Sequence, residues 1–150
     1  EAPVGSYESL LERYAAEVRR GLSTATIAPG LERLREATRS ATWILASGGD
    51  QTELRGVFEK RGLTSFFDGG IYGSPTPKDE ILTSCRDRGL LDGPALFLGD
   101  SRYDFEVASD LGLDFLFVEA WSEFRDWRDH QKVHGYRSVR TLSEILDGVA

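Results

Sequence analysis

Short apolar runs alternate with amphipathic stretches along most of this chain. Residues 41–47, 95–99 and 114–120 form apolar runs of strand length, and 69–73 form a weaker one. The stretches around them repeat apolar residues at helical spacing. This pattern predicts helices over 6–21, 29–37, 50–62, 78–88, 103–111 and 141–146. Strands that are apolar throughout and alternate with helices are typical of a parallel sheet covered on both faces, so we expect a doubly wound (Rossmann-like) α/β fold.

Polar residues mark where several of these elements begin or end. Ser6 can cap the first helix and Gly21 is placed to end it, while Asp50 with Glu53, and Thr141 with Glu144, have the spacing of a capping box. Residues 121–137 fit the pattern less well, because they are aromatic and charged without a clean period. Their aromatic residues at every third position favour one buried helix face over an exposed partner surface: Trp121, Phe124 and Trp127.

Composition and charge narrow the class of protein. The chain has 150 residues, of which 40% are hydrophobic, enough for a single domain with a substantial core. The 25 acidic against 18 basic residues give a net charge of −7, which disfavours a nucleic acid as partner. No apolar run is long enough to span a membrane. Cys85 is the single cysteine, so we expect a reduced, cytoplasmic protein in which Cys85 fills a core position.

Polar side chains follow three of the predicted strands. Ser47 with two glycines closes the first strand, Lys78 follows a proline-rich turn after the second, and Asp100 and Asp104 follow the third. In a parallel sheet the carboxyl ends of the strands meet along one edge, where ligands bind. We therefore expect these residues to face one cleft.

These residue types suit the binding of a metal ion and a phosphate. Two carboxylates one helical turn apart repel each other unless a cation lies beside them, and Mg²⁺ is commonly held by one or two carboxylates with water and phosphate oxygens. Ser47 and the backbone N–H groups of Gly48 and its neighbour can bind an oxyanion, and Lys78 supplies a positive charge. Together they favour phosphoryl transfer.

Each feature also has a purely structural interpretation. A Gly-Asp turn and an acidic residue in the first turn of a helix are common, and a Ser-Gly-Gly loop or one lysine is weak evidence by itself. His130 and His134 have the i, i+4 spacing of a metal-binding pair, but their charged context favours a solvated surface. The hypothesis depends on the three features occurring together and in this order.

These motifs resemble those of the haloacid dehalogenase-like hydrolases, most of which are Mg²⁺-dependent phosphatases. "WILASGG" is similar to the family's second motif, ending at Ser47, and "GSPTPKDEIL" to the third, centred on Lys78. "LFLGDSRYDFEVA" closely resembles the fourth, with its acids at Asp100 and Asp104. The resemblance covers residues from about Pro29 to Val118.

The resemblance implies a fold, a division into domains and a role for each residue. An aspartate would attack the phosphorus of a small phosphorylated metabolite to give an aspartyl-phosphate, which water hydrolyses. Ser47 and Gly48 would bind the phosphoryl group, Lys78 would neutralise it, and Asp100 would hold Mg²⁺ with Asp104 in support. Residues 1–25 resemble the end of a helical cap, and residues 26–150 would form the α/β core.

The chain also departs from the family pattern. Nothing in it resembles the first motif, Asp-x-Asp-Gly-Thr, which supplies the nucleophile, and Asp68-Gly69-Gly70 is only the nearest wording. Lys78 is followed by Asp79 where the family often has proline. The chain contains no methionine, so we expect the first strand and its nucleophile upstream of residue 1. The strand would lie between those ending at Ser47 and Asp100, and the 150 residues alone would bind metal and phosphate weakly without turnover.

Three other interpretations remain open. The fold could have lost its nucleophile and serve as a binding or interaction module, with the aromatic segment as its surface. A receiver-like signalling domain also binds Mg²⁺ through acids, but carries them after its first strand. Dehalogenation occurs in the same superfamily but does not need Mg²⁺. The sequence names neither the substrate, nor a protein partner, nor the oligomeric state.

Overall fold

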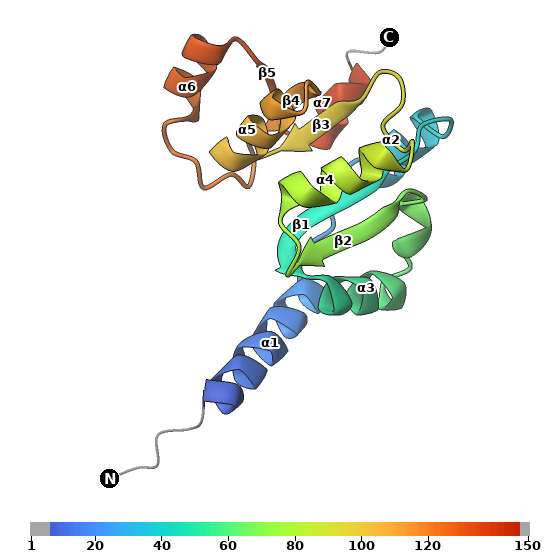
Figure 1. The fold of residues 1–150 in the computed structure, drawn as a ribbon, viewed down its shortest axis with the longest axis vertical. Helices are drawn as coiled ribbons and strands as arrows, with labels where there is room; N and C mark the ends of the chain where they lie inside the picture. The colour runs from blue at the N-terminus through green and yellow to red at the C-terminus, as the bar shows by residue number, and fades with distance from the viewer. Residues whose placement is uncertain (1–6, 148–150) are drawn as a thin grey trace. The chain divides into compact units, whose positions relative to one another are not determined.

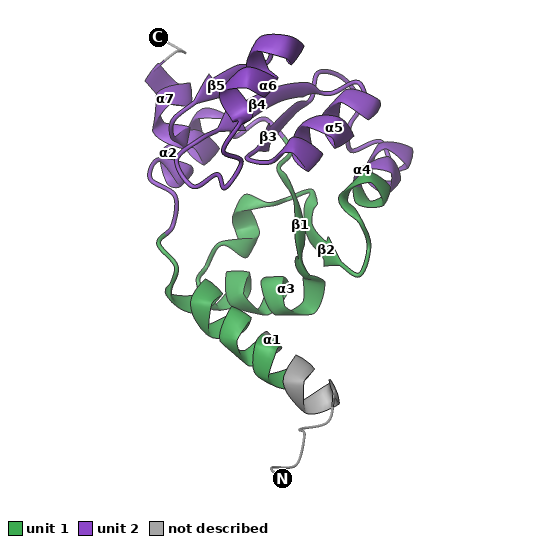
Figure 2. Ribbon diagram, turned by 90° about the vertical axis from the view of Figure 1, so that its left-hand side faces the viewer, with its two compact units in different colours: residues 1–26, 42–81 green, residues 27–41, 82–150 purple. Residues whose placement is uncertain are grey.

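The computed structural model describes residues 7–147, and their contacts divide the chain into two compact units (Figure 2). Unit 1 comprises Glu1–Thr26 and Thr42–Ile81, and unit 2 comprises Ile27–Ala41 and Leu82–Ala150. The boundary near Ile81 falls inside helix α4 (Lys78–Asp87). Each unit is described by itself.

Unit 1 is built on two parallel strands. Strand β1 (Ile44–Asp50) pairs with β2 (Gly70–Ser74), and helix α3 (Gln51–Lys60) packs against both (Figure 1). A short 3₁₀ helix, η1 (Thr64–Phe66), leads into β2. The predicted helical spacing of α3 is confirmed, because its inward positions fill the core together with neighbouring apolar residues: Leu54, Val57, Leu63, Ile71 and Ile81.

The first strand differs from its prediction. We expected residues 41–47 with the glycines as a boundary, but β1 begins at Ile44 and continues through both glycines to Asp50. The pairing is regular from Ile44 to Ala46 and resumes only at Asp50, so the segment between is a bulge. Glycines without side chains to pack allow this irregular pairing, and they therefore extend the strand instead of ending it.

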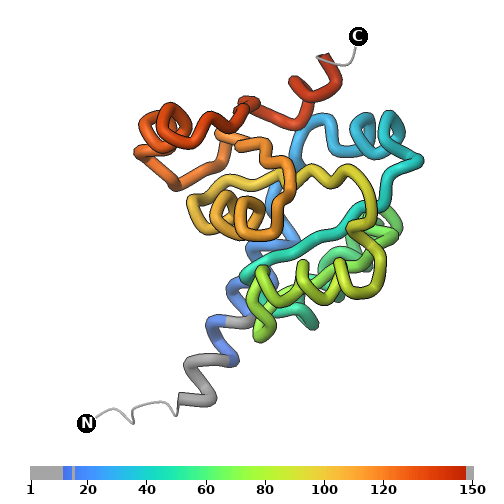
Figure 3. The backbone as a smooth tube through the Cα atoms, turned by 45° about the horizontal axis from the view of Figure 1, so that its top comes forward, coloured from blue at the N-terminus to red at the C-terminus, as the bar shows by residue number. Residues whose placement is uncertain are grey.

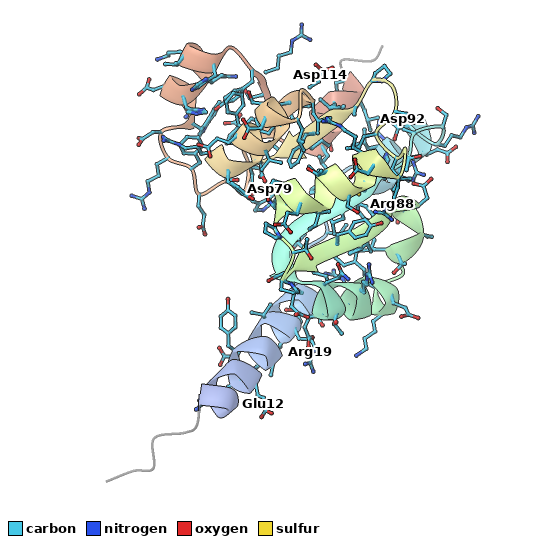
Figure 4. All side chains as sticks on the ribbon, viewed as in Figure 1. Glu12, Arg19, Asp79, Arg88, Asp92 and Asp114 are labelled. Atoms are coloured by element: carbon cyan, nitrogen blue, oxygen red, sulfur yellow. The ribbon has the colours of Figure 1, made fainter. Side chains whose placement is uncertain are left out.

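Helix α1 (Tyr7–Thr24) is joined to α3 by polar contacts. Arg19 Nη2 and Nε donate to the Glu53 carboxylate at 2.8 and 2.5 Å, and Arg61 Nη1 donates to the Leu22 carbonyl at 2.8 Å; Figure 4 labels Arg19 on α1. The helix passes Gly21, so the predicted end is wrong by three residues. The predicted cap at Ser6 lies outside the described residues.

Unit 2 contains a three-stranded parallel sheet in the order β3-β4-β5. Its elements can be followed in Figure 3 from yellow-green to red, after helix α2 in light blue to cyan. They are α2 (Leu31–Ala37), the end of α4, β3 (Leu96–Gly99), α5 (Arg102–Asp110), β4 (Asp114–Val118), α6 (Trp127–His134), β5 (Arg137–Val139) and α7 (Leu142–Asp147). Helix α5 packs on β3 and β4, and α7 packs on β5 and α2.

The core of unit 2 is formed by a few almost completely buried side chains. Phe117 on β4 and Cys85 on α4 are almost completely buried, as are Val107 and Ala108 on α5. The prediction that Cys85 is a core residue is therefore confirmed. Burying side chains of this size supplies the hydrophobic free energy that holds α5 on the strands.

The segment 121–137 forms elements that its pattern did not predict. Helix α6 and strand β5 lie within it, and Trp127 is buried, stacked on Phe117 with ring centroids 4.9 Å apart. Trp121 precedes the helix and is 56% exposed, so the expected single helix face including Trp121 is wrong. His130 is half-buried against Phe105, with centroids 5.1 Å apart, and is not a fully solvated residue.

The predicted α/β class with parallel strands and flanking helices is confirmed. Among the described residues, β1 pairs only with β2, and β3 pairs only with β4. Strands β1 and β3 are therefore edge strands, each of its own sheet. Between residues 7 and 147, none of the helices combines the length and the apolar character needed to cross a bilayer.

Candidate functional site

Ser47 lies in the bulge of β1 and not after the end of the strand. Its Oγ accepts a hydrogen bond from the Gly49 N–H at 3.1 Å, so this N–H is not open to a ligand as expected. Gly48 is exposed, and a Cβ built there would meet no atom within 4 Å. The hydroxyl of Ser47 and the open space over Gly48 are the parts of this loop that a small anion could use.

The bulge is possible because β2 has a glycine opposite it. A Cβ at Gly73 would lie 2.2 Å from the Gly49 carbonyl oxygen, and the Gly73 N–H donates to Gln51 Oε1 at 3.3 Å. Any larger residue at 73 would push the two strands apart. Gly73 is thus needed to hold Ser47 in its place.

Lys78 is the first residue of α4 and is half-buried. The helix follows a turn that begins with a cis Ser74–Pro75 peptide bond, and the Ile81 N–H bonds to the Pro77 carbonyl at 2.9 Å. Because β1 and β2 are parallel, the Ser47 bulge and the Lys78 turn belong to the same edge of this small sheet.

Asp100 and Asp104 come together in unit 2 at the carboxyl end of β3. The Asp100 N–H donates to Asp104 Oδ2 at 3.1 Å, and the Asp104 N–H donates to Oγ of Ser101, which caps α5, at 3.1 Å. Asp104 is 2% exposed, whereas Asp100 is exposed. The two acids therefore differ: Asp104 is buried and holds the backbone of the turn, and Asp100 is an exposed residue.

Gly99 makes room for this arrangement. A Cβ at Gly99 would lie 2.5 Å from Asp104 Cβ and 2.8 Å from Asp104 Oδ2. A side chain there would displace the buried carboxylate, because contacts under 3 Å between such atoms essentially do not occur. The Gly-Asp pair of the sequence is thus explained by packing as well as by chemistry.

The loop after β4 (119–126) also reaches Asp100. Ser122 Oγ donates to the Asp100 carbonyl at 2.5 Å and accepts from the Phe124 N–H at 3.1 Å. Neither Ser122 nor the cap at Ser101 was predicted from the sequence. The rule applied to the other strands could have found Ser122, because it follows the end of the strand next to β3.

The donors at this turn suit a hard cation. Within residues 7–147 no group of three or more His, Cys, Asp or Glu side chains is placed to hold a metal ion. Mg²⁺ does not require such a cage, since one or two carboxylates suffice when water and phosphate complete its octahedron. Asp100 and Asp104 supply only oxygen donors, so this acidic turn fits Mg²⁺ better than a softer metal.

Burial is the largest cause of the pKa shift at two residues in and just after helix α6, His130 and Tyr136. Burial is the main cause that lowers the pKa of His130, with smaller contributions from the neighbouring charges of His134 and Arg102. Glu106 opposes the shift. Burial also raises the pKa of Tyr136, whose hydroxyl lies 3.1 Å from His130 Nδ1 and donates to the Trp127 carbonyl at 3.1 Å.

Comparison with known proteins identifies the fold. No known protein-family profile matches the sequence, and no curated protein matches it. Among solved structures, the chain is similar to a haloacid dehalogenase-like family hydrolase from Streptococcus pneumoniae, with a TM-score of 0.74 and 22% identity over 95% of this chain and 69% of that one.

Two further structures agree with this result. A HAD-superfamily hydrolase from Ehrlichia chaffeensis has a TM-score of 0.64 and 16% identity over 97% of this chain and 77% of that chain. Another hydrolase from Streptococcus pneumoniae has a TM-score of 0.55 and 20% identity over 88% of this chain and 70% of its own. The similarity of the backbone extends over most of the chain. Because the sequence identity is low, the similarity shows the fold and not the reaction.

Proposed function

We propose that this chain, which has the haloacid dehalogenase-like fold, forms part of a Mg²⁺-dependent phosphatase acting on a small phosphorylated metabolite. The fold is that of known hydrolases, and the candidate residues supply a hydroxyl, an ammonium group and two carboxylates. The observation that carries the proposal is the acidic turn. There the buried Asp104 carboxylate accepts the Asp100 N–H, and Gly99 leaves the space that this carboxylate occupies.

In the proposed reaction each residue acts on the phosphoryl group. The Ser47 hydroxyl donates a hydrogen bond to a phosphoryl oxygen, and the open space at Gly48 admits that oxygen close to the backbone. Lys78 contributes a positive charge that offsets the negative charge of the phosphate. These roles follow from residue type and from the positions of the three residues at one edge of the β1-β2 sheet.

Asp100, with Asp104 in support, would hold the Mg²⁺ ion. When bound, Mg²⁺ supplies charge neutralisation for the transferring phosphoryl group. Asp104 Oδ2 already accepts the Asp100 N–H, so the main contribution of Asp104 is to fix the turn. Asp100, which is exposed, is the carboxylate that can reach a ligand.

None of these residues is proposed as the nucleophile. An aspartate carboxylate would attack phosphorus, the bond from phosphorus to the ester oxygen would break, and the departing oxygen would take up a proton. Water would then hydrolyse the aspartyl-phosphate to inorganic phosphate and the free carboxylate. The sequence contains no Asp-x-Asp motif, so we place this aspartate on a strand encoded upstream of residue 1.

Sequencing and activity together test the proposal. The gene upstream of the Glu1 codon is expected to encode an Asp-x-Asp motif, and its full product to hydrolyse p-nitrophenyl phosphate only with Mg²⁺. Asp100→Asn keeps the size of the side chain but removes its charge, and should lower this activity by about a hundredfold or more. Asp92→Asn is the matched control, because Asp92 lies in the loop before β3 and has no proposed role.

Two outcomes would contradict the proposal. Full activity of Asp100→Asn would remove Asp100 from the mechanism. An upstream sequence without aspartates would favour the alternative, a module that binds ligands or partners without turnover.

A further inference from the structure

We propose that Ser122 is a positioning residue for the acidic turn, holding the Asp100 backbone from the loop after β4. The inference extends the proposed function. It rests on that function for one point, that the ion bound by Asp100 is Mg²⁺. The hydrogen bonds that carry the inference lie within unit 2.

The hydrogen bonds of Ser122 define the direction of its hydroxyl proton. Oγ accepts the Phe124 N–H at 3.1 Å, so the single hydroxyl proton is left for the Asp100 carbonyl, 2.5 Å away. The Ser122 N–H in turn bonds to the Glu119 carbonyl at 3.1 Å, which closes a turn at the end of β4. Ser122 is therefore held by hydrogen bonds within its own loop in addition to its bond to Asp100.

Asp100 is held on both sides of its backbone. Its N–H donates to the buried carboxylate of Asp104, and its carbonyl accepts from Ser122. The Asp100 side chain lies between these two bonds and is exposed. With both peptide groups held, fewer side-chain positions are open to the carboxylate, so less conformational entropy is lost when it binds an ion.

A second contact joins the same two loops. The Arg102 guanidinium, at the start of α5, lies 5.3 Å from the centre of the Phe124 ring, within the range of a cation–π interaction. Phe124 also lies 6.3 Å from the buried Phe117 ring on β4. The loop that carries Ser122 is thus anchored to the core and to α5, and can resist movement of Asp100.

Binding of Mg²⁺ and amide hydrogen exchange, measured on the full chain, test this role. Ser122→Ala should weaken Mg²⁺ binding by about tenfold, the size expected for one lost hydrogen bond beside a ligand. It should also speed exchange of the Asp100 amide in the absence of metal. Ser122→Thr keeps the hydroxyl and should restore both properties, whereas Ser122→Val, which has nearly the shape of threonine, should not.

Ser143→Ala is the matched control. Ser143 Oγ also donates to a backbone carbonyl in unit 2, that of Pro29 at 3.2 Å, so this variant loses a bond of the same kind elsewhere. It should leave Mg²⁺ affinity and Asp100 exchange unchanged. An equal loss in Ser143→Ala and Ser122→Ala would mean general destabilisation and would overturn the inference.

The remaining outcomes separate the inference from the proposed function. If Asp100→Asn abolishes Mg²⁺ binding but Ser122→Ala and Ser122→Val do not weaken it, the inference is wrong and the proposed function stands. If the unaltered chain binds no Mg²⁺, the proposed function is wrong, and exchange of the Asp100 amide decides the role of Ser122. If Ser122→Ala does not fold, Ser122→Thr and Ser122→Val are compared instead. Weaker Mg²⁺ binding and faster Asp100 exchange in Ser122→Val than in Ser122→Thr would support the inference, and equal values would overturn it.

Discussion

At the scale of single residues, the structure explains why the strongest motif of the sequence has its particular order. Gly99 leaves the space that the Asp104 carboxylate fills, Asp104 accepts the Asp100 N–H, and Asp100 is left exposed. The sequence predicted both acids as metal-binding residues, with Asp104 in support of Asp100. Their different burial assigns them different tasks, and that difference could not be read from the sequence because both are aspartates.

Replacing Gly99 tests this packing. Gly99→Ala places a methyl group 2.5 Å from Asp104 Cβ and should lower the free energy of unfolding by about 1–3 kcal/mol. Gly56→Ala in α3 is the matched control, since its Cβ would meet nothing within 4 Å. Alanine is the better helix former, so this control should gain about 0.5–1 kcal/mol.

Urea unfolding monitored by circular dichroism measures both variants. The packing argument is wrong if Gly99→Ala is as stable as the unaltered protein. It is also wrong if Gly56→Ala is the more destabilised of the two.

At the scale of elements, the sequence predicted the helices in which apolar residues recur at helical spacing. It missed helix α6, in which an apolar residue is exposed and polar residues are half-buried. The helices α3, α4 and α5 follow their apolar spacing within a few residues. In α6 the apolar Val133 is 79% exposed, while polar His130 and Gln131 are half-buried. Gln131 Nε2 bonds to the Tyr136 carbonyl at 2.9 Å and to Ser138 Oγ at 3.1 Å, so polar contacts replace an apolar face.

The half-buried His130 of α6 predicts a dependence of stability on pH. Because burial lowers the pKa of His130 below 6.5, the unfolded chain takes up the proton first as the pH falls. The stabilising contribution is complete above about pH 6.5 and is lost as the pH drops towards the folded-state pKa. His130→Gln should therefore lose less stability between pH 7 and pH 5 than the unaltered protein.

The titratable and charged groups that influence the pKa of His130 are His134, Arg102 and Glu106. A substitution of His134 therefore serves as the control. His134→Gln, at an exposed position, should change the pH dependence less than His130→Gln. Free energies of unfolding from urea titrations at several pH values give the answer. Identical slopes for His130→Gln and the unaltered protein would contradict the assignment.

At the scale of the whole molecule, the class of fold could be predicted but the details of the sheets could not. Alternation of strands and helices indicated parallel pairing, which both sheets have. The three residues of β5 are too few to form a recognisable pattern, and the glycines of β1 hid three further strand residues. These failures arise where neighbouring strands, and not local preference, decide the structure.

The candidate residues are divided between the two units. Ser47 and Lys78 belong to unit 1, and Asp100 and Asp104 belong to unit 2. These four were identified because each was predicted to follow a strand, whereas Ser122, in the loop after β4, was missed. That all of them face one cleft stays a prediction.

The central claim is that the acidic turn binds a divalent cation through Asp100. Mn²⁺, which favours the same oxygen ligands as Mg²⁺, broadens the NMR signals of nearby nuclei and so locates its own site. Titrated into the ¹⁵N-labelled chain, Mn²⁺ should broaden the amide signals of residues 100–104 first, and excess Mg²⁺ should reverse the effect. Loss of this broadening in Asp100→Asn is the result that we predict. Broadening that is absent, spread over the surface, or unchanged in Asp100→Asn would contradict the claim.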